Sequence, residues 1–496
     1  VEMAVIGDFV AVEERDQYIQ TPIALGSTHL PPDHRLLALA YRQRAESSIN
    51  QQEHDSSLLY LNRAIPILEK EKDWNNWTMC RLMVGINYYF LKEYGAMDSA
   101  FVLVQAHLHD PAVSVSTRSN VSEWLGIQAR IKGDYDAGIR YFRQVIELET
   151  SVADIDSLNL FGQYYQLGNF YYYKGDYRRA LEYYAVARNI YLTLGEEDDN
   201  LSLAYFQIGS INTRLQNYPE AIRNLKQSLA VSERIEAPYP EDIINAKNVL
   251  GKCYIELEQF DSAFFYLQGA LAVPHTFGKA TTNGRLGVCY KATGQIDTAI
   301  VYLQKALELY GNSKNGMNAL WNMHLADCYS QKADYPTAFS YHQKALMASG
   351  PAFEDSLAIH ANPSLEHAQF PIYLLQALHA KAQTLAAYTA DPQALQTAFQ
   401  TYQLAVTLID SLKADYVLES SQLTWGKTFK QIYAEGIEVA RRLHEQIAQS
   451  DYLNEAFVFM EKSKSSLLLD ALRSAEGKAL GGVPDSLSRR EKELVV

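Results

Sequence analysis

The side chains best suited to covalent, redox or metal chemistry in this sequence are its 4 cysteines and 12 histidines. Cys253, Cys289 and Cys328 each stand two residues after a small residue, whereas Cys80 stands apart. A position that recurs in this way serves packing, so we expect buried, reduced thiols. Equivalent helices of adjacent repeats lie about 10 Å apart, beyond the roughly 7 Å that a disulfide allows between Cα atoms. A redox or nucleophilic role is the alternative.

The histidines form no recognisable catalytic or metal-binding pattern. His107 and His109 are two residues apart, but neither a CxxC nor an HExxH sequence occurs. A structural role is expected for His54, and Gly481-Gly482 is an isolated turn and not a phosphate loop. No spacing marks a Ser/His/Asp triad. We therefore expect no enzyme activity within this chain, no cofactor and no metal.

The composition argues against two classes of partner. The formal net charge is −14, and no block of Lys and Arg offers a surface for nucleic acid or an anionic membrane. No run of about 18 apolar residues is present that could span a bilayer. Free thiols favour a reducing compartment, so we expect a cytoplasmic protein. A signal peptide removed before position 1 is the alternative, since Val1 is no initiator residue.

One spacing rule organises the elements that must position any functional side chain. A small residue is followed nine positions later by an aromatic residue or Ile, and three positions after that by another small residue. Small residues let two helices approach to about 8–10 Å, so the rule predicts a helical hairpin whose aromatic residue wedges against the next hairpin. The rule is met at Gly126/Tyr135/Gly138, Gly168/Tyr177/Ala180, Gly209/Tyr218/Ala221, Gly251/Phe260/Ala263, Gly287/Ile296/Ala299 and Ala326/Tyr335/Ala338.

Two further copies precede these six. Gly85 and Tyr94 keep the register, but Met97 stands where a small residue is expected, which predicts a looser helix crossing. An earlier and weaker copy comprises Ala45, His54 and Ser57. The first helices of three other copies are expected to end in a left-handed glycine, at Gly133, Gly175 and Gly294.

This pattern resembles tetratricopeptide repeats over about residues 34–350. The copies are spaced by 41 residues from Gly168 to Gly209 and by 42 from Gly209 to Gly251, against a usual period of about 34. The extra residues most simply lengthen both helices of each hairpin. The resemblance implies an all-α, right-handed superhelical solenoid of extended, about 40-residue repeats.

In the resembled solenoids, the first helix of each hairpin lines the concave face. Residues about three before, one after and four after the small residue can then point inward, and Asn and Tyr side chains suit peptide recognition there. The cluster from Tyr165 to Tyr173 is the preferred site, because aromatic and amide groups converge on it. The alternative is that these are ordinary solvated or packing positions. The expected inward-facing residues are Arg130, Tyr165, Asn169, Tyr172, Tyr173, Phe206, Thr213, Asn248, Lys252, Arg285 and Lys291.

The regions outside the repeats divide by composition. Gly350, Pro351, Pro363 and Pro371 predict a loop or insertion. The expected divisions are an N-terminal extension at 1–33, the repeats at 34–350, the loop at 351–371, a ninth helix pair at 372–412, long helices at 413–476 and a linker at 477–496.

The C-terminal segment resembles the part of bacterial CHAT–tetratricopeptide proteins that joins the repeats to a caspase-like domain. The matching positions are Ala456, Phe457, Glu461, Lys462, Ser463, Lys464, Leu467, Leu468 and the turn Gly482-Val483-Pro484. The resemblance implies a cysteine protease domain beyond residue 496, so we expect a truncated chain with a helix at 454–474 leading toward that domain. The alternative is one more helix pair with a charged face.

These observations predict a sensor or scaffold that binds a protein or peptide in its groove and regulates the missing protease. A stand-alone scaffold without a protease is the second reading. A peptide-pheromone receptor is the third, although no basic recognition helix is evident at the N-terminus.

Overall fold

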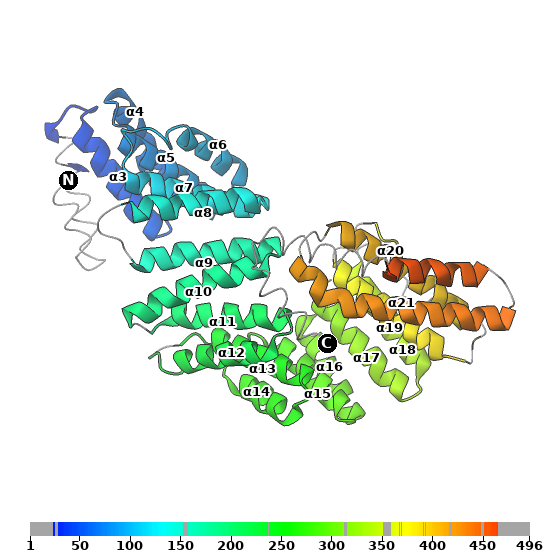
Figure 1. The fold of residues 1–496 in the computed structure, drawn as a ribbon. Helices are drawn as coiled ribbons and strands as arrows, with labels where there is room; N and C mark the ends of the chain where they lie inside the picture. Colours follow the sequence, from blue (N-terminus) through cyan, green and yellow to red (C-terminus); the bar gives the residue numbers. More distant parts are fainter. Residues whose placement is uncertain are drawn as a thin grey trace, which may run out of the picture. The chain divides into compact units, whose positions relative to one another are not determined.

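The computed structural model describes residues 23–464, except 25–27, 152–156, 196, 237, 312–314, 351–358, 367, 369, 390, 392, 416–418 and 448–450. Helices alone form the regular structure of these residues (Figure 1). The helices are α3 (Arg35–Asn50), α4 (His54–Lys70), α5 (Trp74–Phe90), α6 (Tyr94–Gln105), α7 (Val115–Lys132), α8 (Tyr135–Thr150), α9 (Ser157–Lys174), α10 (Tyr177–Leu194), α11 (Asp199–Arg214), α12 (Tyr218–Ser232), α13 (Pro240–Glu256), α14 (Phe260–Ala272), α15 (Lys279–Ala292), α16 (Ile296–Tyr310), α17 (Gly316–Gln331), α18 (Tyr335–Ser349), α19 (Pro371–Ala387), α20 (Ala394–Asp415) and α21 (Glu419–Ile447), followed by a helix over 451–464.

The chain forms two compact units, which are described separately. Unit 1 comprises Val1–Lys174 with Arg179–Leu194, and unit 2 comprises Gly175–Arg178 with Gly195–Val496. Within each unit, consecutive helices pair as antiparallel hairpins, for example α7 with α8 in unit 1 and α15 with α16 in unit 2. The predicted all-α solenoid of helical hairpins is confirmed.

In six hairpins, a glycine of the first helix lies beneath a large side chain of the second helix, sixteen positions further along. A Cβ at Gly126, for example, would lie 2.5 Å from the Phe142 ring. The helices can approach so closely only because glycine has no side chain at this point. The pairs are Gly85/Phe101, Gly126/Phe142, Gly168/Tyr184, Gly209/Leu225, Gly251/Leu267 and Gly287/Leu303.

The second small residue of the rule lies where the two helices cross, as predicted. In two hairpins its backbone carbonyl comes close to the glycine of the first helix. A Cβ on Gly209 would lie 3.2 Å from the backbone oxygen of Ala221, and a Cβ on Gly287 would lie 3.1 Å from that of Ala299. A larger residue on either helix would therefore separate the two backbones. The alanines that the rule names have no exposed surface, so they serve packing: Ala180, Ala221, Ala263, Ala299, Ala326 and Ala338.

Gly138 departs from this arrangement. It is buried in α8, but a Cβ there would overlap the ring of Phe170 in α9. The rule predicts that the second small residue makes room for the first helix of its own hairpin. At Gly138 that prediction needs correction, because the closest approach is to the following hairpin, whose bulky Phe170 occupies the space a side chain would need.

Met97 does not abolish the glycine contact in the second hairpin. Its side chain is buried, and Gly85 still lies directly under Phe101. The hairpin therefore retains the close glycine contact of its sister copies although the second small residue is missing.

The turn inside each of the eight hairpins from α3/α4 to α17/α18 contains a residue with left-handed backbone, seven positions after the small residue. Gly133, Gly175 and Gly294 have φ of 72°, 82° and 79°, which confirms the predicted glycine turns. Five sister copies adopt the same conformation without glycine, at Gln52, Lys92, Gln216, Glu258 and Ala333. The turn geometry is thus a property of the hairpin and not of its sequence.

The aromatic position after the turn joins one hairpin to the next, as predicted. The Tyr135 ring stacks on Tyr173 of the following hairpin, with centroids 5.9 Å apart. The Tyr218 hydroxyl donates to Glu256 at 3.5 Å. His54, at the equivalent place, lies 3.1 Å from Asn87 and stacks on Phe90, so its role is structural.

Stacked tyrosine pairs explain much of the high tyrosine content. Each pair joins the two helices of one hairpin, with ring centroids 5.0–5.5 Å apart and ring planes within 26° of parallel. Such offset aromatic pairs stabilise packing beyond their buried area. The pairs are Tyr171/Tyr183, Tyr254/Tyr266, Tyr290/Tyr302 and Tyr329/Tyr341.

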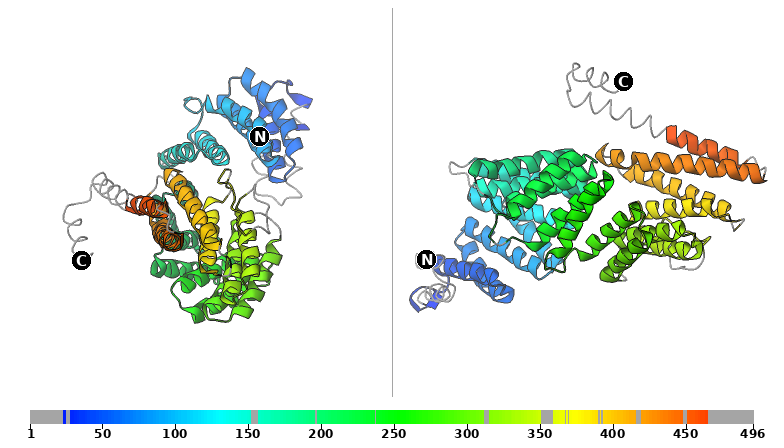
Figure 2. Two further views of the ribbon diagram at one scale, coloured as in Figure 1. Left: turned by 90° about the vertical axis from the view of Figure 1, so that its right-hand side faces the viewer. Right: turned by 90° about the horizontal axis from the view of Figure 1, so that it is seen from below.

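The first helices of unit 2 form its inner layer. Successive first helices contact each other from α11 through α13, α15 and α17 to α19, whereas successive second helices make no comparable contact in the part of the chain that the structure describes. Closer spacing of one layer than of the other curves the stack toward the first helices (Figure 2). The side chains of α13 and α15 therefore line the inner surface.

Not all of the extra repeat length lies in the helices. Segments 233–239 and 273–278 connect hairpins, because Pro240 begins α13 and Val273 already has extended backbone. The expectation that the extra residues lengthen both helices is therefore wrong for these two connections. The proline imposes a helix start, since its ring cannot continue a preceding helix.

The last helices of unit 2 are joined by a half-buried carboxylate. Glu435 of α21 accepts hydrogen bonds from His379 of α19 at 2.6 Å and from the Tyr402 hydroxyl of α20 at 2.9 Å. The helix over 451–464 packs through Phe459 against Gly436 and begins earlier than the predicted residue 454. The predicted linker at 477–496 and the positions Leu467, Leu468 and Gly482–Pro484 lie outside the described residues.

Candidate functional site

One stripe of polar side chains on α13 faces the inner surface of unit 2. Asn245, Asn248 and Lys252 follow one another at helical spacing, so they share a face of the helix. Asn248 is buried, and Asn245 and Lys252 are half-buried. These polar side chains are thus partly or fully buried at positions that apolar residues could also have occupied.

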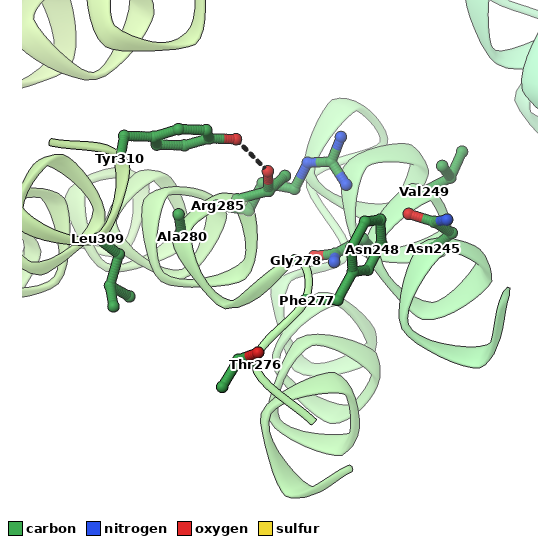
Figure 3. Close-up of a pocket in the computed structure, with 11 residues that line it drawn as sticks. Asn245, Asn248, Val249, Thr276, Phe277, Gly278, Ala280, Arg285, Leu309 and Tyr310 are labelled. Atoms are coloured by element: carbon green, nitrogen blue, oxygen red, sulfur yellow. Dashed lines mark hydrogen bonds between the residues drawn. The ribbon is translucent and has the colours of Figure 1, made fainter. Parts of the chain in front are cut away.

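A cavity of about 490 Å³ opens beside this stripe (Figure 3). Its walls come from α13, from the connection before α15, and from α15 and the end of α16. The Tyr310 hydroxyl and the Thr281 hydroxyl are 2.6 Å apart and close one side. The lining residues are Asn245, Asn248, Val249, Thr276, Phe277, Gly278, Ala280, Thr281, Arg285, Leu309 and Tyr310.

The guanidinium of Arg285 extends from α15 toward α13 (Figure 3). Burial lowers the pKa of Arg285 to about 10, so the charge is poorly solvated. Among the described residues, Arg285 makes neither an ion pair nor a hydrogen bond. Tyr310, Cys253 and Tyr373 oppose this lowering of the Arg285 pKa, but burial outweighs them.

Lys252 adds a second cation to this region. Burial and then the charge of Arg285 lower the pKa of Lys252, and Arg214 contributes in the same direction. Glu256, one turn along α13, opposes that shift, but it is exposed and accepts from Tyr218. Over the residues that the structure covers, the ammonium of Lys252 has no ion-pair or hydrogen-bond partner.

The side-chain oxygen of Asn248 is buried without a hydrogen bond. A buried, unsatisfied carbonyl costs about 1–3 kcal/mol unless a ligand or water supplies a donor. The same holds for the oxygens of Asn283 and Asn322, whose amide nitrogens bond to backbone oxygens of their own helices. Asn248 differs because it lines the cavity.

Other polar groups of the same inner layer are already paired. Lys291 donates to Asp327 at 2.7 Å, and His324 lies 3.7 Å from the same carboxylate. Burial raises the Asp327 pKa, but the nearby His324 and the charge of Lys291 outweigh burial, so the pKa lies well below its usual range. Thr213 donates to the Gly209 carbonyl at 2.9 Å and lies 3.1 Å from Cys253. Lys291 and Thr213 therefore serve structure.

The structure brings together some of the residues predicted from the sequence. Asn248 and Arg285 both line the cavity, from α13 and α15, and Lys252 lies one turn beyond Asn248 on α13. Phe206 instead packs, half-buried, against the core around Leu225.

The preferred cluster on α9 belongs to unit 1. Its Asn169 accepts a hydrogen bond from the Tyr184 hydroxyl at 2.6 Å and donates to Gln166, so its amide is engaged inside the hairpin. Tyr165 stacks with Phe161.

The rest of the predicted surface in unit 1 is more open. Tyr172 meets Tyr173 edge-on, and Tyr173 is 53% exposed. Arg130 is exposed at the end of α7. These residues remain a predicted binding surface.

Sequence reasoning missed the cavity residues that do not follow the repeat rule. Thr276, Phe277 and Gly278 lie in a connection, and Leu309 and Tyr310 end a second helix. Gly278 has a φ of 69°, and a Cβ there would lie 2.6 Å from the Ile244 side chain, so the connection packs closely onto α13. The short Thr-Phe-Gly sequence between two hairpins was the available signal.

The four cysteines are free and buried, as predicted. Burial raises the pKa of Cys80 and of Cys289 to about 12 and that of Cys328 to about 11, which disfavours their thiolate forms. Within the described ranges, His, Cys, Asp and Glu form no group of three that could hold a metal ion. No described helix combines the length and the apolarity needed to cross a membrane.

Comparison with known proteins agrees with this architecture. Residues 199–274 and 278–348 match the family model of the tetratricopeptide repeat, so these two segments are repeats of that type. The chain matches no curated protein.

Three solved structures are similar. The apo form of the quorum sensor NprR from B. thuringiensis has a TM-score of 0.51 at 13% identity, over 74% of this chain and 97% of that one. The apo form of RapI has a TM-score of 0.43 at 13% identity, over 55% and 97%. YrrB, described as a TPR protein with an unusual peptide-binding site, has a TM-score of 0.28 at 20% identity, over 42% and 91%. The similarity to NprR shows a shared fold, an all-α solenoid of tetratricopeptide type.

Proposed function

We propose that this chain binds a peptide, or an extended segment of a protein, on the inner surface of unit 2. The observation that carries this proposal is the cavity beside α13, where the buried oxygen of Asn248 has no partner. An extended peptide presents backbone N–H and C=O groups that an asparagine amide can satisfy in both directions. The cavity volume of about 490 Å³ falls in the range of ligand pockets.

The surroundings of the cavity suit a peptide side chain better than a small polar metabolite. Phe277 is 44% exposed at the rim, and Val249, Ala280 and Leu309 supply apolar walls. Apolar walls with a few fixed polar groups are typical of binding pockets. The tetratricopeptide match over this part of the chain supports a binding scaffold, and NprR, which shares the fold, is described as a quorum sensor.

Selection from a phage-displayed library of random 12-residue peptides on the full chain tests the proposal. We expect enrichment of peptides that bind the wild-type chain and bind the double variant Asn245→Ala/Phe277→Ala at least about tenfold more weakly. Both residues are partly exposed, so the variant should fold. The variant Tyr165→Ala/Tyr173→Ala is the matched control in unit 1. Absence of any enriched peptide contradicts the proposed function, and equal binding to all three proteins contradicts the site.

The C-terminal resemblance supports a finer proposal about what binding does. We propose that the chain regulates an attached caspase-like domain through the helix over 451–464. Phe459 anchors this helix, and Lys462 pairs with Asp410 of α20 at 2.7 Å, while Phe457 is 58% exposed. An anchored helix with a free apolar face can pass a change in the repeats to a neighbouring domain.

The coding sequence that follows residue 496 tests this finer proposal. A strand-and-helix pattern carrying a His and a Cys supports regulation of a protease, and a stop codon contradicts it. With a stop codon, the chain is a stand-alone peptide-binding scaffold.

A further inference from the structure

We infer that residues 359–366 form a strap that fixes the last helices of unit 2, and that the buried Lys381 holds this strap in place. The strap belongs to the connection between α18 and α19, and it contacts α18, α19 and α20. It is separate from the cavity beside α13, so the inference does not rest on the proposed peptide binding. It concerns how the helix over 451–464 is held, whatever domain follows that helix.

The first argument is the place of Lys381 in α19. Lys381 lies six residues before the end of its helix, and the same position is a buried leucine in three earlier first helices, at Leu250, Leu286 and Leu325. Lys381 itself has no exposed surface. Because an enclosed ammonium is costly unless it is hydrogen-bonded, a lysine at this core position needs specific partners.

The strap supplies partners for this ammonium. Lys381 donates to the Ala361 carbonyl at 2.5 Å and to the side-chain oxygen of Asn362 at 3.0 Å. The amide of Gln343 on α18 donates to the same Ala361 carbonyl at 3.3 Å. A residue before proline favours extended backbone, and Asn362 precedes Pro363. The strap therefore forms no helix here, and its carbonyls depend on donors from α18 and α19.

The other side of the strap binds α20. The Asn362 amide donates to the Thr401 hydroxyl at 3.0 Å, and Nδ1 of His360 lies 2.6 Å from the Thr397 hydroxyl. Both threonines are buried, and both donate to backbone carbonyls one turn earlier. Nε2 of His360 also lies 3.1 Å from the carboxylate of Asp391, just before α20. The strap thus joins Lys381 of α19 to one turn of α20.

That turn of α20 also holds the helices that follow it. Tyr402 donates to Glu435 of α21 at 2.9 Å. Phe399 packs against Tyr452 and Phe459 of the helix over 451–464, with ring centroids 5.5 Å and 5.9 Å apart. A continuous series of contacts therefore runs from the strap to the C-terminal helix, and release of the strap should loosen that helix.

The strap can open while the hairpins stay folded. It contains no regular secondary structure, and His360, Ser364 and Glu366 are exposed. Ile359 and Leu365 are only partly buried where they pack against the core of unit 2. Segments with few buried apolar contacts and no helical hydrogen bonds open at a lower free energy than the helices beside them. The strap is therefore the element with two states, closed and open.

Hydrogen–deuterium exchange of the full chain tests the inference with Lys381→Met, which removes the ammonium and suits a leucine position. We expect exchange to accelerate at least about tenfold in segment 359–366 and at least about threefold in the helix over 451–464, with no change in α13 and α15. Lys344→Met is the matched control, because it removes the same charge from an exposed position on α18. Unchanged exchange in segment 359–366, or in the helix over 451–464, overturns the inference.

A second variant keeps the test decisive if Lys381→Met disturbs the whole of unit 2. Asn362→Ala removes the strap's side-chain bonds to Lys381 and Thr401 and leaves the core position intact. We expect the same pattern of faster exchange, at least about threefold in segment 359–366 and detectable in the helix over 451–464. Faster exchange confined to the strap shows that the strap does not fix the C-terminal helix, and unchanged exchange in the strap shows that these bonds do not hold it; either result overturns the inference.

Discussion

Gly168 of α9 lies directly beneath the ring of Tyr184 of α10, so close that a Cβ on Gly168 would be 2.7 Å from the ring carbons. Tyr184 is fully buried, and its hydroxyl donates to Asn169, the next residue along α9. The same contact, between a glycine and the side chain sixteen positions later, recurs in the other hairpins. This contact between the two helices of a hairpin is a close packing contact that the repeats share.

The variant Gly168→Ala is expected to lower the free energy of unfolding by about 1–3 kcal/mol, because the added methyl group must displace the buried Tyr184 ring. Urea unfolding followed by circular dichroism measures the change. Gly162→Ala, in the same helix, is the control. Nothing lies within 4 Å of a Cβ there, so helix propensity should raise stability by about 0.5–1 kcal/mol. Equal changes in the free energy of unfolding for the two variants would show that the contact between Gly168 and Tyr184 does not restrict the residue at position 168.

At turn residues with left-handed backbone, we expect that introducing glycine raises the stability of the fold. Glu258 has a φ of 56°, which costs a residue with a Cβ about 1–2 kcal/mol. Glu258→Gly removes this cost and adds some chain entropy to the unfolded state, so we expect a net gain of about 0.5–1 kcal/mol.

The equivalent turn of the next hairpin supplies the control. Gly294 has a φ of 79° and open space around it, so Gly294→Ala should destabilise by about 1 kcal/mol through backbone strain alone. Differential scanning calorimetry compares the two variants. A lower melting temperature for Glu258→Gly would refute the strain argument.

His342 predicts a pH-dependent loss of stability. It occupies the buried position that carries Leu225, Leu267 and Leu303 in sister hairpins, and its Nε2 lies 2.8 Å from the Thr384 hydroxyl. Burial lowers the pKa of His342 to about 4, with Asp327 raising it and Lys381 lowering it. Because the pKa is lower in the folded state than the usual value of about 6.5, the unfolded state binds the proton first. Stability should fall as the pH drops from about 6.5 to about 4.

The expected loss between pH 7.5 and pH 5 is about 2 kcal/mol from this histidine. His342→Leu should remove that share, since leucine is the residue of three sister copies. The comparison isolates His342 from His324, whose pKa burial also lowers. Urea unfolding at the two pH values, for both proteins, gives the difference. The same pH dependence in His342→Leu and in the wild-type chain would contradict the assignment.

The hairpins could be predicted from the sequence because their small residues repeat with a fixed spacing. Gly126, Gly209 and Gly251 mark places where a side chain would displace a residue of the second helix, and this restriction to small residues leaves a clear signal. Spacing alone does not say which neighbour excludes the side chain. Gly138 was therefore assigned to its own hairpin, whereas Phe170 of the next one lies against it.

Other parts of the hairpin leave no signal in the residue type. The large residue sixteen positions after the small residue could not be recognised from the sequence. Phe142, Leu225 and His342 are all buried there, but they belong to different chemical classes. The five left-handed turns without glycine could not be predicted for the same reason. The residue types at Gln216 and Glu258, for example, do not indicate a left-handed backbone.

The candidate site was predictable only where it follows the repeat. Asn248, Lys252 and Arg285 were found because inner-face positions recur along the first helices. Phe277 and Tyr310 could not be found, because a connection brings them to the cavity and no periodicity governs its path.

The sequence favours the α9 cluster because it is rich in aromatic and amide side chains, such as Tyr165 and Asn169. The spacing of these residues does not reveal that the Tyr184 hydroxyl already binds the Asn169 amide. A residue's availability depends on its partners in space, which the repeat register does not specify.

Hydrogen–deuterium exchange of the full chain, with and without a peptide selected from the displayed library, tests the central claim most directly. The account predicts slower exchange in α13 (Pro240–Glu256) and in segment 276–285 when the peptide is bound, and no change in α8 of unit 1. Protection confined to α9 (Ser157–Lys174), or absent from α13 and segment 276–285, would contradict the placement of the binding site on the inner surface of unit 2.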